Sequence, residues 1–167
     1  LAELGKPVAI GCSGNFTLER ALVRTGLPIV SNDISLYTSA IGRAILDPQG
    51  LALATPRAEW LRPYCDDAER LAVAVLVLSG NWDKRTGREH DARRYAVQSQ
   101  FCGLHAETLQ RRRAVWALLR QQVQAYTLGD IGEHFARYGQ GYVQCAFMPT
   151  YIGGYDKLWE MLEALFE

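Results

Sequence analysis

The first 46 residues alternate between short apolar runs and amphipathic segments, and this alternation limits the possible folds most strongly. Two apolar runs, 7–10 and 28–32, are typical of buried strands. Each precedes a segment whose apolar residues have helical spacing, 15–22 and then 35–46, which stops before Pro48. Parallel strands need crossover helices between them, so this order predicts an α/β domain with a parallel sheet.

The middle of the chain lacks this alternation. Residues 68–78 follow two acidic residues and favour a helix, 81–88 favours a loop, and 89–124 predicts one or two helices. We therefore expect a single domain over residues 1–167, an open, mostly parallel sheet interrupted by a helical insertion at 51–125. After the insertion we expect a helix at 131–138, a strand at 141–147, a loop at 148–154 and a final helix at 155–166.

Composition excludes several classes of protein. A length of 167 residues suits one compact domain, and the longest apolar run, 71–78, is far shorter than the ~18 residues of a membrane helix. The start at Leu1 has no signal-peptide pattern, so we expect a cytoplasmic protein, and the absence of an initiator Met favours a fragment. The 18 basic and 18 acidic residues cancel and give no overall attraction to nucleic acid or membrane.

The cysteines and histidines indicate no metal site. The four cysteines are far apart, and none forms a CxxC or Cys/His pair with metal-ligand spacing. The three histidines are scattered as well. We expect free, buried thiols and no bound metal.

Two features at strand ends can carry ligand chemistry. The turn Ile10-Gly11-Cys12-Ser13-Gly14-Asn15 lets the backbone approach a ligand closely, although a plain tight turn explains it equally well. Asp33 follows the second strand, where a carboxylate can accept hydrogen bonds from ribose hydroxyls; the alternative is that Asp33 or Ser35 caps the next helix. No GxxxxGK[ST] motif is present, so a ribose-bearing cofactor without phosphates to hold, such as S-adenosylmethionine, fits better than ATP.

Four segments in order resemble the motifs of Dam-like adenine-N6 DNA methyltransferases. They are Ile10-Gly11-Cys12-Ser13-Gly14, Asn32-Asp33-Ile34, Asp130-Ile131 and Met148-Pro149-Thr150-Tyr151. Segments 14–18 and 149–155 look most like phage antirestriction adenine methyltransferases. The resemblance implies a Rossmann-like, S-adenosylmethionine-dependent methyltransferase fold.

The resemblance also assigns roles to particular residues. Tyr151 would stack on a target adenine flipped out of the duplex, and the Pro149 carbonyl would accept a hydrogen bond from its amino group. Asp33 would hold the ribose of the cofactor, Asp130 would accept from its adenine amino group, and Ile131 would pack on the adenine ring. The cofactor's methionine part would lie against Gly11, Ser13 and Gly14.

Departures from the family pattern leave alternatives open. Met148 replaces an acidic or amide residue and cannot usefully accept the amino proton. Thr150 replaces a proline, and Cys12 replaces a glycine. Family members also have further strands after the last motif, so we expect a missing C-terminal segment, a protein partner or a pared-down relative. The alternative functions are a catalytically impaired binding module for DNA, a virion or a protein, and a methyltransferase with another amino-bearing acceptor.

A basic stretch lies in the insertion, where the family type places its DNA-recognition region. Residues 83–113 hold eight Lys or Arg and four acidic residues, a net charge of +4 within a neutral chain. Contacts to the phosphates of double-stranded DNA are one interpretation, and a solvated helical face is the other. The candidate DNA-binding residues are Lys84, Arg85, Arg88, Arg93 and Arg94. Such an enzyme would protect phage DNA in the cytoplasm of a bacterial host, with a virion-associated location as the alternative.

Overall fold

The computed structural model describes residues 5–50, 54–81, 88–146 and 155–167, with the backbone alone at 88–90, 93 and 155–159. Four strands in this part of the chain form one sheet in the order β3-β2-β1-β4, and all neighbours are parallel. The strands are β1 (Val8–Gly11), β2 (Ile29–Asp33), β3 (Val123–Leu128) and β4 (Val143–Ala146). The predicted α/β class and the Rossmann-like methyltransferase fold are confirmed.

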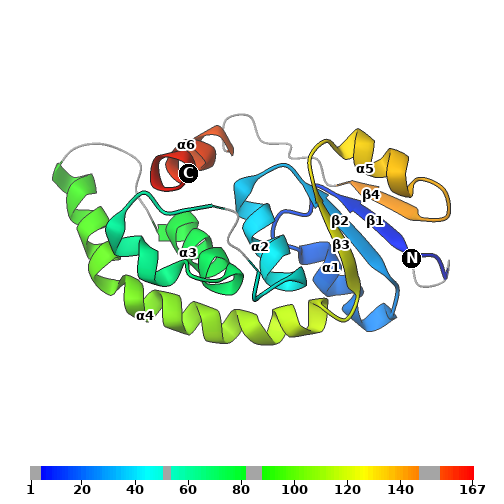
Figure 1. The fold of residues 1–167 in the computed structure, drawn as a ribbon, viewed down its shortest axis with the longest axis horizontal. Helices are drawn as coiled ribbons and strands as arrows, with labels where there is room; N and C mark the ends of the chain where they lie inside the picture. Colours follow the sequence, from blue (N-terminus) through cyan, green and yellow to red (C-terminus); the bar gives the residue numbers. More distant parts are fainter. Residues whose placement is uncertain (1–4, 51–53, 82–87, 147–154) are drawn as a thin grey trace.

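Helices cover both faces of the sheet, as parallel strands require. Side chains alternate between faces along a strand. Ser31 of β2 contacts α1 (Thr17–Leu22), and Tyr126 of β3 packs on α2 (Leu36–Leu46). The next residue along β3, Thr127, contacts His134 of α5 (Ile131–Tyr138) on the opposite face. The chain thus forms a helix–sheet–helix sandwich (Figure 1).

The insertion between β2 and β3 is helical. It contains the 3-10 helix η3 (Glu59–Tyr64), the buried helix α3 (Ala68–Asn81) and the long helix α4 (Arg88–Leu119). Helix α4 runs along one side of the molecule and contacts α3, α2 and α1 (Figure 1). The helix predicted over 68–78 is confirmed.

The predicted helix over 89–124 is too long. Helix α4 ends at Leu119, and β3 begins at Val123, so the expected boundary of the insertion at residue 125 falls inside β3. After the helix the chain forms a turn, in which the amides of Gln121 and Gln122 donate to Leu118 O and Leu119 O. The Arg120 side chain reaches α2, where its Nη2 and Nε donate to the carbonyl oxygens of Ala44 (2.6 Å) and Ile45 (2.9 Å). Val123 is then buried against the core and pairs with β2.

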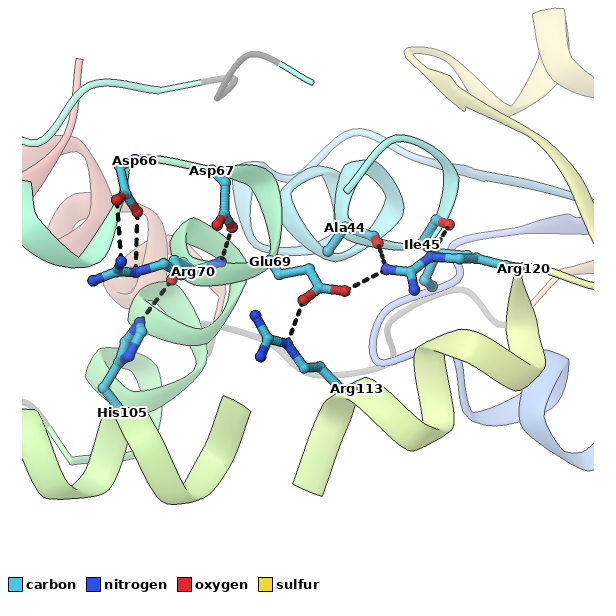
Figure 2. A network of polar contacts seen from close by, with 9 residues as sticks. All are labelled: Ala44, Ile45, Asp66, Asp67, Glu69, Arg70, His105, Arg113 and Arg120. Atoms are coloured by element: carbon cyan, nitrogen blue, oxygen red, sulfur yellow. Dashed lines mark hydrogen bonds and ion pairs between the residues drawn. The ribbon is translucent and has the colours of Figure 1, made fainter. Parts of the chain in front are cut away.

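A buried carboxylate fastens the insertion to the sheet layer (Figure 2). Glu69 of α3 accepts hydrogen bonds from Arg113 Nε at 2.6 Å and from Arg120 Nη2 at 2.5 Å. Burial alone would raise the pKa of Glu69, but the two guanidinium groups outweigh burial and lower that pKa. The ion pairs therefore join α3, α4 and the end of α2 into one unit.

The C-terminal helix α6 (Tyr155–Leu165) contacts α2 and α3. Beyond it, Thr55 and Glu167 exchange backbone hydrogen bonds at 2.8 and 2.9 Å, and Phe166 is buried. The last residues of the described chain are thus attached to the segment before η3.

The cysteines differ in exposure. None of the four forms a disulfide, and Cys65 is buried. Cys102 is exposed, so the expectation of buried thiols is wrong there. Within the described ranges, no helix is long and apolar enough to cross a membrane.

Candidate cofactor site

The carboxyl ends of the parallel strands lie at one edge of the sheet, and between β1 and β4 the order of the strands reverses. The chain passes from β1 to β2 and β3 on one side, and returns through α5 to β4 on the other. Such a switch point between β1 and β4 is where open α/β sheets bind ligands. The loop after β1 and the residues after β2 and β3 all lie at this edge.

The loop after β1 has an unusual backbone. Cys12, Gly14 and Phe16 have φ angles of 59°, 53° and 56°, in the left-handed region that side chains disfavour. The Ser13 amide donates to Asn32 O at 3.0 Å, and the Phe16 ring is fully buried, so tertiary contacts hold the loop in this shape. Among the described atoms, a Cβ at Gly14 would meet only Cys12 O, at 4.0 Å, so a ligand can approach the backbone there.

Asp33 is central to the site. Its Oδ2 accepts from the Gly14 amide at 3.0 Å, and its Oδ1 accepts from the amides of Ile34 (2.8 Å) and Ser35 (3.0 Å). A carboxylate has about four acceptor positions, so one position on Oδ2 stays open for a hydroxyl group. Ser35 itself caps α2 by accepting from the Thr38 amide. Asp33 therefore shapes the turn before α2 and can also face a ligand.

Asp130 begins α5. Its Oδ1 accepts from the amides of Gly132 (2.7 Å) and Glu133 (3.2 Å), the arrangement of a helix N-cap. The preceding residue, Gly129, has a φ of 137°, and its amide donates to Asp33 O at 3.2 Å. Asp33 and Asp130 are thus brought to the same edge of the sheet.

Gly11 has a packing role that the sequence did not reveal. A Cβ atom there would lie 2.3 Å from Ile131 Cδ1 and 2.5 Å from Ile131 Cγ1. The glycine therefore lets α5 pack against the end of β1. Ile131 is half-buried and lies beside the glycine loop, although the two residues are 120 positions apart in the sequence.

A buried glutamate lies beneath the loop. Glu19 of α1 is fully buried and accepts from Ser31 Oγ at 2.9 Å. Burial raises the pKa of Glu19 more than the hydroxyl groups of Ser13 and Ser31 lower it. Ser13 is itself buried, so its side chain supports the loop from below, and a cofactor would meet its backbone instead.

Two exposed aliphatic side chains at this edge were not among the predicted site residues. Ile34 is 66% exposed and Leu128 is 61% exposed, and each is next to a residue of the site. Leu128 pairs in register with Asp33. Large apolar side chains exposed beside a carboxylate can pack against the ring of a ligand. The signal in the sequence was an aliphatic residue within two positions of each acidic motif residue, Ile34 after Asp33 and Leu128 before Asp130.

A cavity of about 210 Å³ adjoins the site on the α5 side. Asn32 lies in its wall, and the Asn32 amide donates to Thr127 O (2.9 Å) and Gly129 O (3.0 Å). These hydrogen bonds fix the end of β3 and hence the position of Asp130.

Most of the other predicted site residues lie outside the part of the chain that the structure describes. Pro149, Tyr151, Lys84 and Arg85 lie outside the described residues, and the side chains of Arg88 and Arg93 are not described either. Arg94 is described, and its Nη1 lies 3.6 Å from Asp91 Oδ1. Met148 and Thr150 also fall outside the described part of the chain.

The residues present fit an adenosine-containing cofactor. Open backbone at Gly14 and Gly129, a free acceptor position on Asp33 and exposed apolar side chains match a ribose and a purine. No group of three or more His, Cys, Asp or Glu side chains is placed to hold a metal ion within the described ranges.

The comparisons with known proteins agree with this geometry. No curated protein and no solved structure matches the chain significantly. One family model, described as Phage DNA Adenine Methylase-like domain 1, matches residues 1–167. With the parallel sheet and the polar edge after β1, β2 and β3, this match over the whole chain shows that the protein belongs to the family of phage DNA adenine methylase-like domains.

Proposed function

We propose that the chain is an S-adenosylmethionine-dependent methyltransferase that acts on the N6 amino group of adenine in double-stranded DNA. The observation that carries the proposal is the junction of Gly14, Asp33 and Gly129 through two hydrogen bonds at the carboxyl edge of the sheet. The membership of the family supports DNA as the substrate. Protection of phage DNA from restriction in the host cytoplasm is the role that we propose.

The cofactor would be held by the edge residues. Asp33 Oδ2 would accept from a ribose hydroxyl, and Ile34 and Ile131 would contact the purine ring. The backbone at Gly14 would lie against the methionine part, and Asp130 would accept from the adenine amino group. When bound, S-adenosylmethionine supplies an electrophilic methyl group.

Catalysis would rest mainly on positioning the target adenine. Tyr151 would stack on the flipped-out base, and the Pro149 carbonyl would accept a hydrogen bond from its amino group. That bond orients the nitrogen lone pair for in-line attack. These roles are those that the resemblance to the family implies, and they are compatible with the end of β4 at Ala146, three residues before Pro149.

Calorimetry with S-adenosylmethionine tests the cofactor site. Asp130→Asn keeps the oxygen that caps α5 and removes the negative charge, so binding should weaken about tenfold, the loss of one charge-assisted hydrogen bond. Glu133→Gln makes the same charge change one turn along α5 and should leave binding unchanged. Equal binding by both variants would reject Asp130 as a cofactor ligand.

A methyl-transfer assay on duplex DNA tests the reaction. Tyr151→Ala should abolish labelling of adenine and retain cofactor binding. A binding module is the second candidate function, because Met148 stands where the family has an acidic or amide residue. That alternative predicts no transfer by the natural chain and the appearance of transfer in Met148→Asp.

A further inference from the structure

A second cavity, of about 600 Å³, lies between α1, α3 and α4, away from the residues of the cofactor site. Three arginines from two distant parts of the sequence line it: Arg20 of α1, and Arg111 and Arg112 of α4. Asn81 and Thr108 add polar groups, and aliphatic side chains of α3 and α4 form the rest of the wall. We call this cavity the arginine cleft.

The charges of the arginine cleft are poorly balanced. Among the described residues, no acidic side chain lines it. Arg20 and Arg112 have no side-chain hydrogen bond or ion pair with any residue that the structure describes. Arg111 lies 3.5 Å from Glu107, but both side chains are more than 60% exposed, and such surface pairs contribute little.

Other arginines of the same helix are used differently. Arg113, and Arg120 just after the helix, both bind the buried carboxylate of Glu69. These two contacts hold α3 against α4. The arginines of the cleft have no comparable partner in the part of the chain that the structure describes. Three like charges around one opening repel one another, so an anion from outside would be stabilised there.

We propose that the arginine cleft binds backbone phosphates of duplex DNA, as a contact surface additional to residues 84–94. This inference rests on the proposed function, in which DNA is the substrate. Guanidinium groups form bidentate hydrogen bonds with phosphate oxygens. Consecutive residues point about 100° apart on a helix, so Arg111 and Arg112 suit successive phosphates along a strand better than one small anion.

Fluorescence anisotropy with a labelled duplex, at several salt concentrations, tests the proposal. Arg20→Gln and Arg112→Gln should each weaken binding several-fold and reduce the slope of log K against log salt by about 0.9. Arg24→Gln is the matched control, since Arg24 is an exposed arginine close to Arg20 that does not line the cleft. It should leave affinity and slope unchanged. Arg20 is on the surface, so Arg20→Gln stays informative if Arg112→Gln folds poorly.

The outcomes separate this proposal from the proposed function. If both cleft variants bind like Arg24→Gln, the cleft proposal is overturned and DNA remains the substrate. If the unaltered chain binds no duplex even at low salt, both are overturned. A third outcome is that Arg20→Gln weakens the binding of dAMP, while Arg20→Gln and Arg112→Gln both leave the affinity for the duplex unchanged. The cleft would then hold a small phosphate ligand, and the assignment to duplex DNA would be overturned.

Discussion

The close approach of Gly11 to Ile131 joins the glycine loop to α5. We predict that Gly11→Ala destabilises the protein by about 1–3 kcal/mol, the usual penalty for overpacking. Because the clash is with the Ile131 side chain, Ile131→Ala should relieve it. Urea unfolding of both single variants and the double variant measures the coupling. Additive effects would show that Gly11 is needed for another reason.

The buried Glu19 should make the stability of the protein depend on pH. Its folded pKa is raised above the ordinary value of 4.5, so protonated Glu19 favours the folded state. Its contribution is therefore complete below pH 4.5 and is lost as the pH rises through the folded pKa. Glu19→Gln keeps an acceptor for Ser31 and does not titrate.

We expect Glu19→Gln to be more stable than the natural chain at pH 8, by about 1 kcal/mol, the scale of burying a polar group without full hydrogen bonding. The difference should shrink as the pH falls toward 4.5. Thermal unfolding across this pH range measures it. Ser31→Ala, which leaves the carboxyl group in place, should retain the pH dependence. A constant difference between Glu19→Gln and the natural chain would contradict the prediction.

The attachment of α3 to α4 depends on Glu69. Glu69→Gln should cost about 2–3 kcal/mol, because two guanidinium groups lose a buried carboxylate partner and both are partly exposed to solvent. Glu107→Gln removes an exposed carboxylate on α4 and should cost less than about 0.5 kcal/mol. Chemical unfolding measures the free energy of unfolding of the two variants. Equal losses would show that Glu69 does not hold α3 to α4.

The pKa of Glu69 adds a second test of the same contact. Because its folded pKa is lowered, its stabilisation is present above pH 4.5 and is lost as the pH falls through the folded pKa. The natural chain should therefore lose stability in acid more steeply than Glu69→Gln. If the free energy of unfolding falls equally steeply with pH in the natural chain and in Glu69→Gln, the prediction is contradicted.

The elements with strong patterns could be predicted from the sequence, and those fixed by distant contacts could not. The strand–helix alternation predicted β1, α1, β2 and α2, because each apolar run had a clear period and a turn signal. Strand β3 was missed because Gln121, Gln122 and Gln124 continue the polar composition of α4. Just after the end of α4, Arg120 contacts α2 more than 70 residues away in the sequence, and the local sequence does not reveal such a contact.

The candidate site follows the same division. Asp33 could be placed from its position after an apolar run, at the carboxyl end of a predicted strand. Asp130 was expected only from the resemblance to the family, because the strand before it was missed. Their use as backbone acceptors depends on loop geometry that spacing alone does not give. The packing of Gly11 on Ile131 also depends on how α5 crosses the sheet. The alternative for Asp33, that it shapes the start of α2, is compatible with cofactor binding.

At the scale of the whole molecule, zero net charge hides a separation of charge. The basic stretch at 83–113 is balanced by acidic residues elsewhere, and α4 places Arg111 and Arg112 opposite Arg20 of α1. A neutral chain can therefore present a basic surface of local extent, and DNA binding should be strongly salt-dependent.

We also propose that the sheet and its helical insertion unfold as one domain. Phe166 tests this, since it is buried beside residues 55–57 and far in sequence from the first strands of the sheet. Phe166→Ala should cost about 3–5 kcal/mol, the usual loss for a buried phenylalanine. Because Glu69 and Arg120 join the layers, the loss should lower one common transition instead of creating a second.

Circular dichroism and tryptophan fluorescence provide the measurement. Three of the four tryptophans, Trp60, Trp82 and Trp116, belong to the insertion, so fluorescence reports mainly on it once Trp159 of α6 is replaced by Phe in the protein that is measured. Circular dichroism reports on all helices. In Phe166→Ala the two signals should change at the same, lower urea concentration. Glu163→Ala, an exposed position on α6, is the control and should leave the free energy of unfolding within about 0.5 kcal/mol of the natural value. Separate midpoints for the two signals would mean that the insertion unfolds independently, and the single-domain proposal would then fail.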